Sequence, residues 1–273
     1  MYESMYGAFL GDIIGSRFEF NRNEEKNKEG FELFAENCDY TDDSVMTIAI
    51  MEALANAGKK ADIETIHRKC IESMKKWGTR FPDAGYGGYF RRWLNSNDIN
   101  PYNSYGNGSA MRVSGAGWAY DSIERTREVA RATAEVTHNH PEGIKGAECT
   151  AAIMYLARTG ENKKVIRDYV VKEFQYNLSH NLEEYQQPPH KFYVSCQDSL
   201  PRAITCFLES FSFEETIRNA VSLGGDTDTI AAIAGAMADA YYGVPKELIE
   251  KGKMYLPESI SKGIEIYKIF VYN

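Results

Sequence analysis

The sequence lacks the features that define several large classes of protein. Its five cysteines form no CxxC pair, and an odd number suits a reducing compartment better than a disulfide framework. No apolar run approaches the ~18 residues that a membrane-spanning helix requires. The amino terminus has no basic region before its first apolar residues. We therefore expect neither a signal peptide nor a membrane span, and we predict a cytoplasmic protein.

Positive charge is scarce as well. The 31 Lys and Arg residues are outnumbered by 39 Asp and Glu residues, which gives a net charge of -8. Nucleic acid backbones select basic surfaces, so we do not expect a nucleic acid partner. A nucleotide-like small ligand stays compatible with this charge, because a bound metal ion can reverse the local sign of a site.

Strand patterns are nearly absent, and residues 31–34 are the one short candidate. Apolar residues instead recur at helical spacing. This spacing predicts helices over residues 4–14, 44–57, 63–77, 123–136, 143–158, 164–176, 200–210, 213–222, 230–242, 247–254 and 259–267. No Ser/Gly/Pro linker divides the chain, and residues 186–191 are typical of a loop between helices. We predict an all-α fold, one domain over residues 1–273, and a monomer.

Three glycines fall four residues apart in the first predicted helix. Gly7, Gly11 and Gly15 therefore share one helix face. Glycine weakens a helix, so three on one face suggest close approach of another backbone. Simple loop flexibility is the alternative.

Two short loops are rich in acidic residues. The first, Thr41-Asp42-Asp43, precedes a predicted helix, and ordinary N-capping is enough to explain it by itself. The second follows Gly224-Gly225 and alternates Asp226 and Asp228 with two threonines. A cap explains one of these aspartates but not readily both.

Together the two acidic loops point to a metal centre. Four carboxylates and the threonine hydroxyls are hard oxygen ligands, which favour Mg²⁺, Mn²⁺ or Ca²⁺ over Zn²⁺. If folding brings the loops together, their charges repel strongly unless cations offset them. Two cations roughly 3.5–4 Å apart are a familiar arrangement.

A third loop, residues 104–112, has the sequence SYGNGSAMR. Backbone N–H groups in such a glycine-rich loop can bind phosphate, although an ordinary turn is an equally good explanation. The loop contains neither a P-loop motif nor a Rossmann fingerprint.

These segments, taken in order, resemble the ADP-ribosylglycohydrolase family, which includes dinitrogenase reductase-activating glycohydrolase and the ADP-ribosylhydrolases. The matching segments are GAFLGDIIGSRFEF at 7–20, YTDDS at 40–44, AGYGGYFRRWL at 84–94, SYGNGSAMR at 104–112, THNHPEG at 137–143 and SLGGDTDTIAAIAGAMADAYYG at 222–243. The resemblance implies an all-α orthogonal helical bundle with a central binuclear site for two Mg²⁺ or Mn²⁺ ions.

The resemblance also assigns roles to individual residues. It implies metal ligands at Thr41, Asp42, Asp43, Asp226, Asp228 and Thr229, and catalytic roles for Glu19, Asp43 and Asp228. Substrate would be bound by Gly85, Gly87, Gly88, Tyr105, Gly106, Asn107, Gly108, Ser109, Met111 and His138. Ser109 stands where relatives often carry Ala or Gly, which puts its contact with the distal ribose in doubt.

We therefore predict a metal-dependent hydrolase that releases ADP-ribose from modified protein side chains or small conjugates. Arginine, serine and O-acetyl linkages all fit the sequence. Two other functions stay open at this stage: a catalytically silent ADP-ribose-binding protein and a two-metal phosphoester hydrolase.

Overall fold

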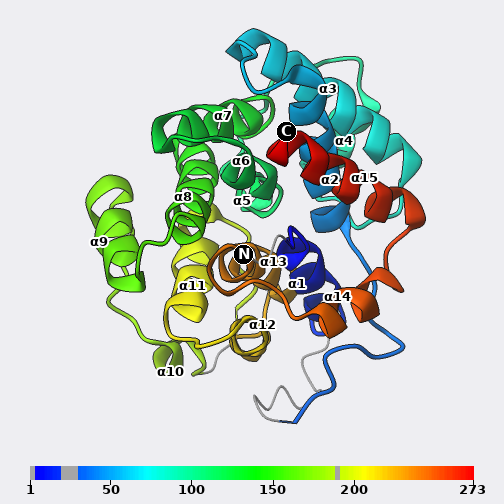
Figure 1. Cartoon of the computed structure of the whole chain (residues 1–273). Helices are drawn as coiled ribbons and strands as arrows, with labels where there is room; N and C mark the ends of the chain where they lie inside the picture. Colours follow the sequence, from blue (N-terminus) through cyan, green and yellow to red (C-terminus); the bar gives the residue numbers. More distant parts are fainter. Residues whose placement is uncertain (1–3, 20–29, 188–190) are drawn as a thin grey trace.

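A computed structural model describes residues 4–19, 30–187 and 191–273 (Figure 1). The described residues contain helices and no strand, which confirms the predicted all-α fold. The helices are α1 (Gly7–Ser16), α2 (Asp42–Ala57), α3 (Ile63–Arg80), α4 (Gly88–Asn95), α5 (Gly108–Met111), α6 (Ser114–Ala119), α7 (Ile123–Glu135), α8 (Pro141–Arg158), α9 (Lys163–Phe174), α10 (Leu182–Tyr185), α11 (Cys196–Leu208), α12 (Phe213–Ser222), α13 (Thr227–Tyr242), α14 (Lys246–Lys253) and α15 (Glu258–Tyr272).

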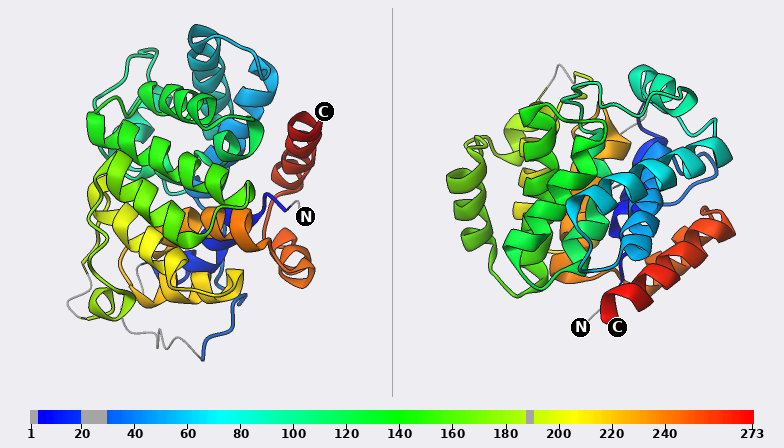
Figure 2. Two further views of the ribbon diagram at one scale, coloured as in Figure 1. Left: turned by 60° about the vertical axis from the view of Figure 1, so that its left-hand side comes forward. Right: turned by 90° about the horizontal axis from the view of Figure 1, so that it is seen from above.

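Helices α1 and α13 form the centre of the molecule and run antiparallel (Figures 1 and 2). A Cβ atom added to Gly7 would lie 2.3 Å from the Gly235 carbonyl oxygen, and one added to Gly15 would lie 2.5 Å from that of Thr227. At Gly11 the corresponding distance, to the oxygen of Ala231, is 2.1 Å. The expectation that this glycine face meets another backbone is therefore confirmed.

The other helices surround this pair. Helices α8, α11 and α12 pack on α13, and α2 packs on α3 and α15. Figure 2 shows α9 and α15 on the outside, on different sides of the molecule. Within the described residues, no helix combines the length and the apolar character that are needed to cross a bilayer.

The strand expected at residues 31–34 is wrong. These residues form an irregular segment with no strand partner, and their aromatic side chains are buried. Phe31 packs edge-on against Phe18, and Phe34 stacks on Tyr255 of the segment after α14. Burial of an aromatic side chain therefore explains the apolar pattern without any sheet. The loop expected at residues 186–191 lies partly outside the described residues.

Two helices begin earlier than their apolar pattern predicts, and this positions the acidic loops. Helix α2 begins at Asp42 rather than at residue 44, and α13 begins at Thr227 rather than at residue 230. Asp42, Asp43, Asp228 and Thr229 therefore lie in first helical turns. Helices fix side-chain directions more tightly than loops do, so both acidic segments have defined geometry.

Candidate active site

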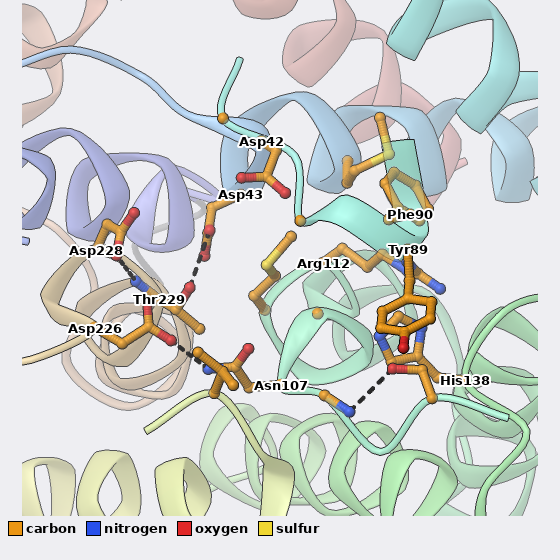
Figure 3. A pocket seen from close by; sticks show the side chains of 18 of the residues that line it. Asp42, Asp43, Tyr89, Phe90, Asn107, Arg112, His138, Asp226, Asp228 and Thr229 are labelled. Carbon is orange, nitrogen blue, oxygen red and sulfur yellow. Dashed lines mark hydrogen bonds between the residues drawn. The ribbon is translucent and has the colours of Figure 1, made fainter. Parts of the chain in front are cut away.

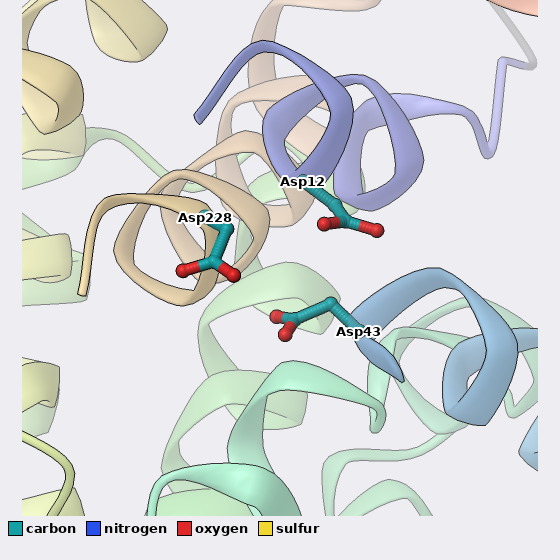
Figure 4. Close-up of side chains that lie close together, drawn as sticks. All are labelled: Asp12, Asp43 and Asp228. Carbon is teal, nitrogen blue, oxygen red and sulfur yellow. The ribbon is translucent and has the colours of Figure 1, made fainter. Parts of the chain in front are cut away.

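The two acidic loops lie face to face, at the start of α2 and the start of α13. Thr229 Oγ1 donates a hydrogen bond of 3.1 Å to Asp43 Oδ2, although the two residues are 186 positions apart. Figure 4 shows Asp43 and Asp228 directed toward one another, with Asp12 of α1 beside them. The fold thus brings together the segments that the sequence analysis singled out.

Capping accounts for part of the first acidic loop. Thr41 is the N-cap of α2, and its Oγ1 accepts a bond of 3.2 Å from the Asp43 N–H. The Thr41 hydroxyl also lies 3.5 Å from the buried Asp43 Oδ2, whereas Asp43 Oδ1 has no hydrogen-bond partner. The capping explanation therefore holds for Thr41 and leaves the Asp43 carboxylate available.

The second acidic loop turns on two glycines in the left-handed region, with φ of 66° at Gly224 and 77° at Gly225. Asp226 follows at the N-cap position of α13, but its side chain makes no capping bond. Its Oδ2 instead accepts a bond of 2.6 Å from Asn107 Nδ2 in the glycine-rich loop. Capping therefore does not explain Asp226.

Asp12 is a residue of this site that the sequence analysis missed. It is fully buried on α1, and its Oδ1 accepts a bond of 2.7 Å from Thr41 Oγ1. Its Oδ2 accepts from the Thr41 N–H at 2.9 Å, the Ser44 N–H at 3.0 Å and the Ser44 hydroxyl at 2.5 Å. Asp12 therefore holds the start of α2 in place. The available signal was one carboxylate among apolar residues and glycines in the sequence GAFLGDIIG.

Glu19 lies in the bend that follows α1, directly before residues 20–29, which are not among those described. The carboxylate oxygens of Glu19, Asp226 and Asp228 lie within 4.8 Å of one another. Those of Asp12, Asp43 and Asp228 form a second group with the same spacing. Asp228 belongs to both groups, so it stands at the centre of the acidic cluster.

Burial and mutual repulsion raise the pKa values throughout this cluster. Burial, followed by the charge of Asp12, raises the pKa of Asp42 to about 8. Burial raises the pKa of Asp12 and that of Asp226 to about 6. Asp43 and Asp228 have pKa values well above the ordinary range, first from burial and then from neighbouring carboxylates. The cluster therefore holds its full negative charge at neutral pH only if cations offset it.

The acidic cluster forms one side of a pocket with a volume of about 330 Å³, within the size range of small-molecule sites. Figure 3 shows Arg112, His138 and Tyr89 across the pocket from Asp226, Asp228 and Asp43. Of the predicted substrate-binding residues, those that line the pocket are Gly85, Gly87, Gly88, Gly106, Asn107, Gly108, Met111 and His138. All but Thr41 of the predicted metal and catalytic residues line it too.

Three predicted site residues do not line the pocket. Thr41 is turned toward Asp12, as described above. The Ser109 side chain is fully buried and its hydroxyl donates a bond of 2.7 Å to the Gly143 carbonyl oxygen. Tyr105 is 53% exposed, with its ring against His140.

Other lining residues were not predicted from the sequence. Tyr89 is 70% exposed at the pocket and stacks on Tyr102 with ring centroids 6.2 Å apart. Arg112 also lines the pocket and is 1% exposed. Phe192 and Val194 line it from the segment before α11. The signal available for Arg112 was its place at the end of the glycine-rich SYGNGSAMR segment.

The donor set of the acidic cluster fits hard divalent cations. It consists of carboxylate and hydroxyl oxygens, and no Cys or His belongs to either group of clustered ligands in the described residues. Asp43 Oδ1 is a buried oxygen in this set that has no hydrogen-bond partner, so it is free to bind a cation. Such a set suits Mg²⁺ or Mn²⁺ better than Zn²⁺.

Comparison with known proteins agrees with this geometry. Human "ADP-ribosylhydrolase ARH3" is 28% identical over 334 aligned positions, which cover 96% of this chain and 88% of that protein. The "ADP-ribosyl-[dinitrogen reductase] glycohydrolase" of Rhodospirillum rubrum is 25% identical, over 97% of this chain and 95% of that protein.

A solved structure described as "ADP-ribosylglycohydrolase-related protein complex" has the same fold. It superposes with a TM-score of 0.73 and 21% identity, over 98% of this chain and 95% of that one. The family model described as ADP-ribosylglycohydrolase matches residues 1–262. The chain therefore belongs to the ADP-ribosylglycohydrolase family, whose members are hydrolases that act on glycosyl bonds.

Proposed function

We propose that this pocket releases ADP-ribose by hydrolysing the bond at its anomeric carbon. The observation that carries the proposal is the convergence of two acidic helix starts on one side of the pocket, joined by the bond between Thr229 and Asp43. Thr41, Asp42 and Asp43 would hold cations from one side, and Asp226, Asp228 and Thr229 from the other. We propose two cations, Mg²⁺ or Mn²⁺.

Cations bound there would compensate the charge of ADP-ribose, polarise a water molecule and orient ribose hydroxyls. The protein itself would contribute by holding the proposed ligand residues in position. Asp12 holds the first turn of α2 through four hydrogen bonds, and Asn107 holds Asp226. Both contacts keep ligand oxygens in place when substrate enters.

Glu19 is our candidate for the general acid and base. Burial, with Asp226 and Asp12 nearby, raises its pKa to about 7, which suits proton transfer at neutral pH. Its carboxyl group is half-buried at the pocket, within reach of a substrate beside Asp226 and Asp228. Cleavage develops positive charge at the anomeric carbon, which the nearby carboxylates Asp43 and Asp228 would stabilise.

The opposite side of the pocket suits the rest of the ligand. Gly85, Gly87 and Gly88 leave space close to the backbone, and Asn107 and Gly108 begin the short helix α5. Arg112 adds the positive charge that a diphosphate requires. We propose that ADP-ribose lies across the pocket, with its reacting ribose toward the acidic cluster.

The names of the relatives guide the choice of substrate. They refer to ADP-ribosylated dinitrogen reductase and, for a Pseudomonas putida protein that is 26% identical over 91% of this chain, to ADP-ribosylarginine. We propose that this chain acts as a monomer on an ADP-ribosylated protein or a small ADP-ribose conjugate.

A release assay tests the proposal. Arginine-, serine- and O-acetyl-linked ADP-ribose would be incubated with the protein in Mg²⁺, in Mn²⁺ and in EDTA, and the products separated by chromatography. We expect free ADP-ribose with at least one substrate, and its loss in EDTA. Production of AMP and ribose phosphate would indicate phosphoester hydrolysis instead. Tight binding of ADP-ribose without product from any substrate would indicate a binding protein.

A further inference from the structure

Arg112 is a buried cation in the pocket wall, and beyond the charge that it contributes there it makes hydrogen bonds to the end of α7 and the residues that follow it. Its side chain is 1% exposed and forms no ion pair with any carboxylate of the described residues. Its Nη2 atom donates to Thr137 Oγ1 at 2.7 Å and to the Thr133 carbonyl oxygen at 3.3 Å. A buried guanidinium whose hydrogen-bond acceptors are neutral oxygens is costly, so its position calls for an explanation.

Thr137 connects this cation to His138. The distance between Thr137 Oγ1 and His138 Nδ1 is 2.8 Å. Arginine can only donate, so the Thr137 oxygen accepts from Arg112 and has one hydrogen of its own to donate. Within the described part of the chain, the acceptor that this hydrogen meets is His138 Nδ1. If Nδ1 were protonated, the buried Thr137 hydrogen would have no acceptor.

The other imidazole nitrogen, Nε2, faces the glycine-rich loop. A Cβ atom on Gly108 would lie 3.1 Å from it, and one on Gly106 would lie 3.5 Å from it. The described residues offer Nε2 no hydrogen-bond partner, and His138 lines the pocket (Figure 3). Burial and then the Arg112 charge hold the pKa of His138 well below its ordinary value, so the ring is neutral and carries one proton.

We propose that Arg112 is a positioning residue that acts through Thr137 to hold His138 in the Nε2–H tautomer, so that the pocket wall presents a hydrogen-bond donor to a substrate oxygen. The tautomer of a histidine is set by the partner of its other nitrogen. The identity of the substrate oxygen, on the diphosphate or a ribose, rests on the proposed function. The tautomer itself is a property of the free protein.

Nitrogen-15 NMR tests the tautomer directly. Two-bond proton–nitrogen correlations would be recorded on protein labelled with ¹⁵N-histidine, and His138 assigned by its loss in His138→Gln among the five histidines. We expect the Nε2–H pattern in the parent protein. Thr137→Val removes the connecting hydroxyl and should give a mixture of tautomers, whereas Thr137→Ser keeps the hydroxyl and the pattern. Arg112→Met should resemble Thr137→Val if it folds.

The affinity for ADP-ribose, measured by calorimetry, tests the consequence. We expect Thr137→Val to weaken binding about five- to tenfold, in line with the loss of one hydrogen bond, and Thr137→Ser to change it by less than about twofold. An Nδ1–H pattern in the parent protein, or an unchanged pattern in Thr137→Val, would overturn the proposal. Equal affinity in the two Thr137 variants would overturn the role toward substrate. Absence of ADP-ribose release by the parent protein refutes the proposed function and leaves the NMR result intact.

Discussion

The two ends of the α1–α13 pair each bury aspartate, yet they differ in what surrounds it. At one end, Asp239 Oδ2 accepts a bond of 2.8 Å from the Gly7 N–H at the start of α1. At the other end lie Asp12, Asp228 and their acidic neighbours. At each end one oxygen, Asp239 Oδ1 or Asp43 Oδ1, has no hydrogen-bond partner. An orphaned oxygen alone therefore does not mark a cation site.

Charge balance distinguishes the two ends. Burial is the one cause that raises the pKa of Asp239, to about 7, and nearby N–H groups, a hydroxyl and a lysine act against it. For Asp228, four neighbouring carboxylates add to the effect of burial. A lone buried carboxylate can be stabilised by local donors, whereas a group of them in a pocket requires cations. The comparison predicts that the two ends respond differently to substitution and to metal.

The largest difference should appear in activity. Asp228→Asn removes a charge at the centre of the acidic cluster, while Asp239→Asn makes the same change at the other end. Loss of even an outer-shell contact to a metal ligand typically costs about 10–100-fold. Because Asp228 is itself a proposed ligand, we expect Asp228→Asn to lower kcat/KM by at least about 100-fold. Asp239→Asn should change kcat/KM by less than about twofold. Steady-state release assays and titration with Mn²⁺ measure both.

Similar activity in these two variants would contradict the assignment of the acidic cluster as the cation site. The melting temperature of each variant shows whether a loss of activity is caused by unfolding. If Asp228→Asn lost activity but bound Mn²⁺ as tightly as the parent protein, its role would be catalytic only.

A second difference should separate stability from activity. Gly7→Ala and Gly15→Ala each place a Cβ atom against the α13 backbone, 2.3 Å from the Gly235 oxygen and 2.5 Å from the Thr227 oxygen. Such overpacking costs about 1–3 kcal/mol of unfolding free energy, partly offset by the better helix propensity of alanine. The Gly15 substitution also meets the Asp228 Cα at 2.6 Å, so it alone should shift a proposed ligand.

Urea unfolding and kcat/KM measured on both variants test this prediction. We expect both to be destabilised, and Gly15→Ala alone to lose activity beyond its loss of folded protein. Equal activity in the two variants would show that the acidic end tolerates movement of α13. Gly30→Ala serves as the control for the substitution itself, since Gly30 does not line the pocket and no atom lies within 4 Å of its added Cβ.

The features that the sequence predicted well are those with local signals. The spacing of Gly7, Gly11 and Gly15 indicated a helix contact, and paired glycines before Asp226 indicated a turn. Helix periodicity identified the long helices. The sequence could not predict which residues contact one another. A contact between positions as distant as 12 and 41 depends on the whole fold.

The misses have the same physical origin. Asp12 looks like one polar interruption of an apolar helix until α2 is placed beside it. Arg112 is the last residue of the glycine-rich SYGNGSAMR segment, but its burial follows from the packing of α5 and α7. The short helix α5 has too few residues for any periodic signal. Segment 31–34 was misassigned because burial of aromatic residues imitates a strand pattern.

The third and most informative difference concerns pH. At the acidic end, folding raises the pKa of Asp42 from 3.8 to about 8 and that of Asp226 to about 6. The folded state therefore binds more protons than the unfolded chain between roughly pH 4 and 8. This contribution to stability is fully present below the unfolded pKa values and is lost as pH rises through the folded ones. Each excess proton corresponds to about 1.4 kcal/mol per pH unit.

Bound cations should reduce the pH dependence of stability that comes from the acidic cluster, and leave the part that comes from Asp239. We expect the melting temperature in EDTA to fall from pH 5 to pH 8, and Mg²⁺ to raise it much more at pH 8, where fewer protons compete for the carboxylates. The slope that persists in Mg²⁺ should come from Asp239, whose pKa is also raised, to about 7, but whose carboxylate belongs to neither group of clustered ligands. Asp239→Asn should reduce that residual slope and leave the response to Mg²⁺ unchanged. An equal rise with Mg²⁺ at both pH values would mean that the ion binds elsewhere, since ligands with raised pKa values cannot bind a cation without first losing their protons.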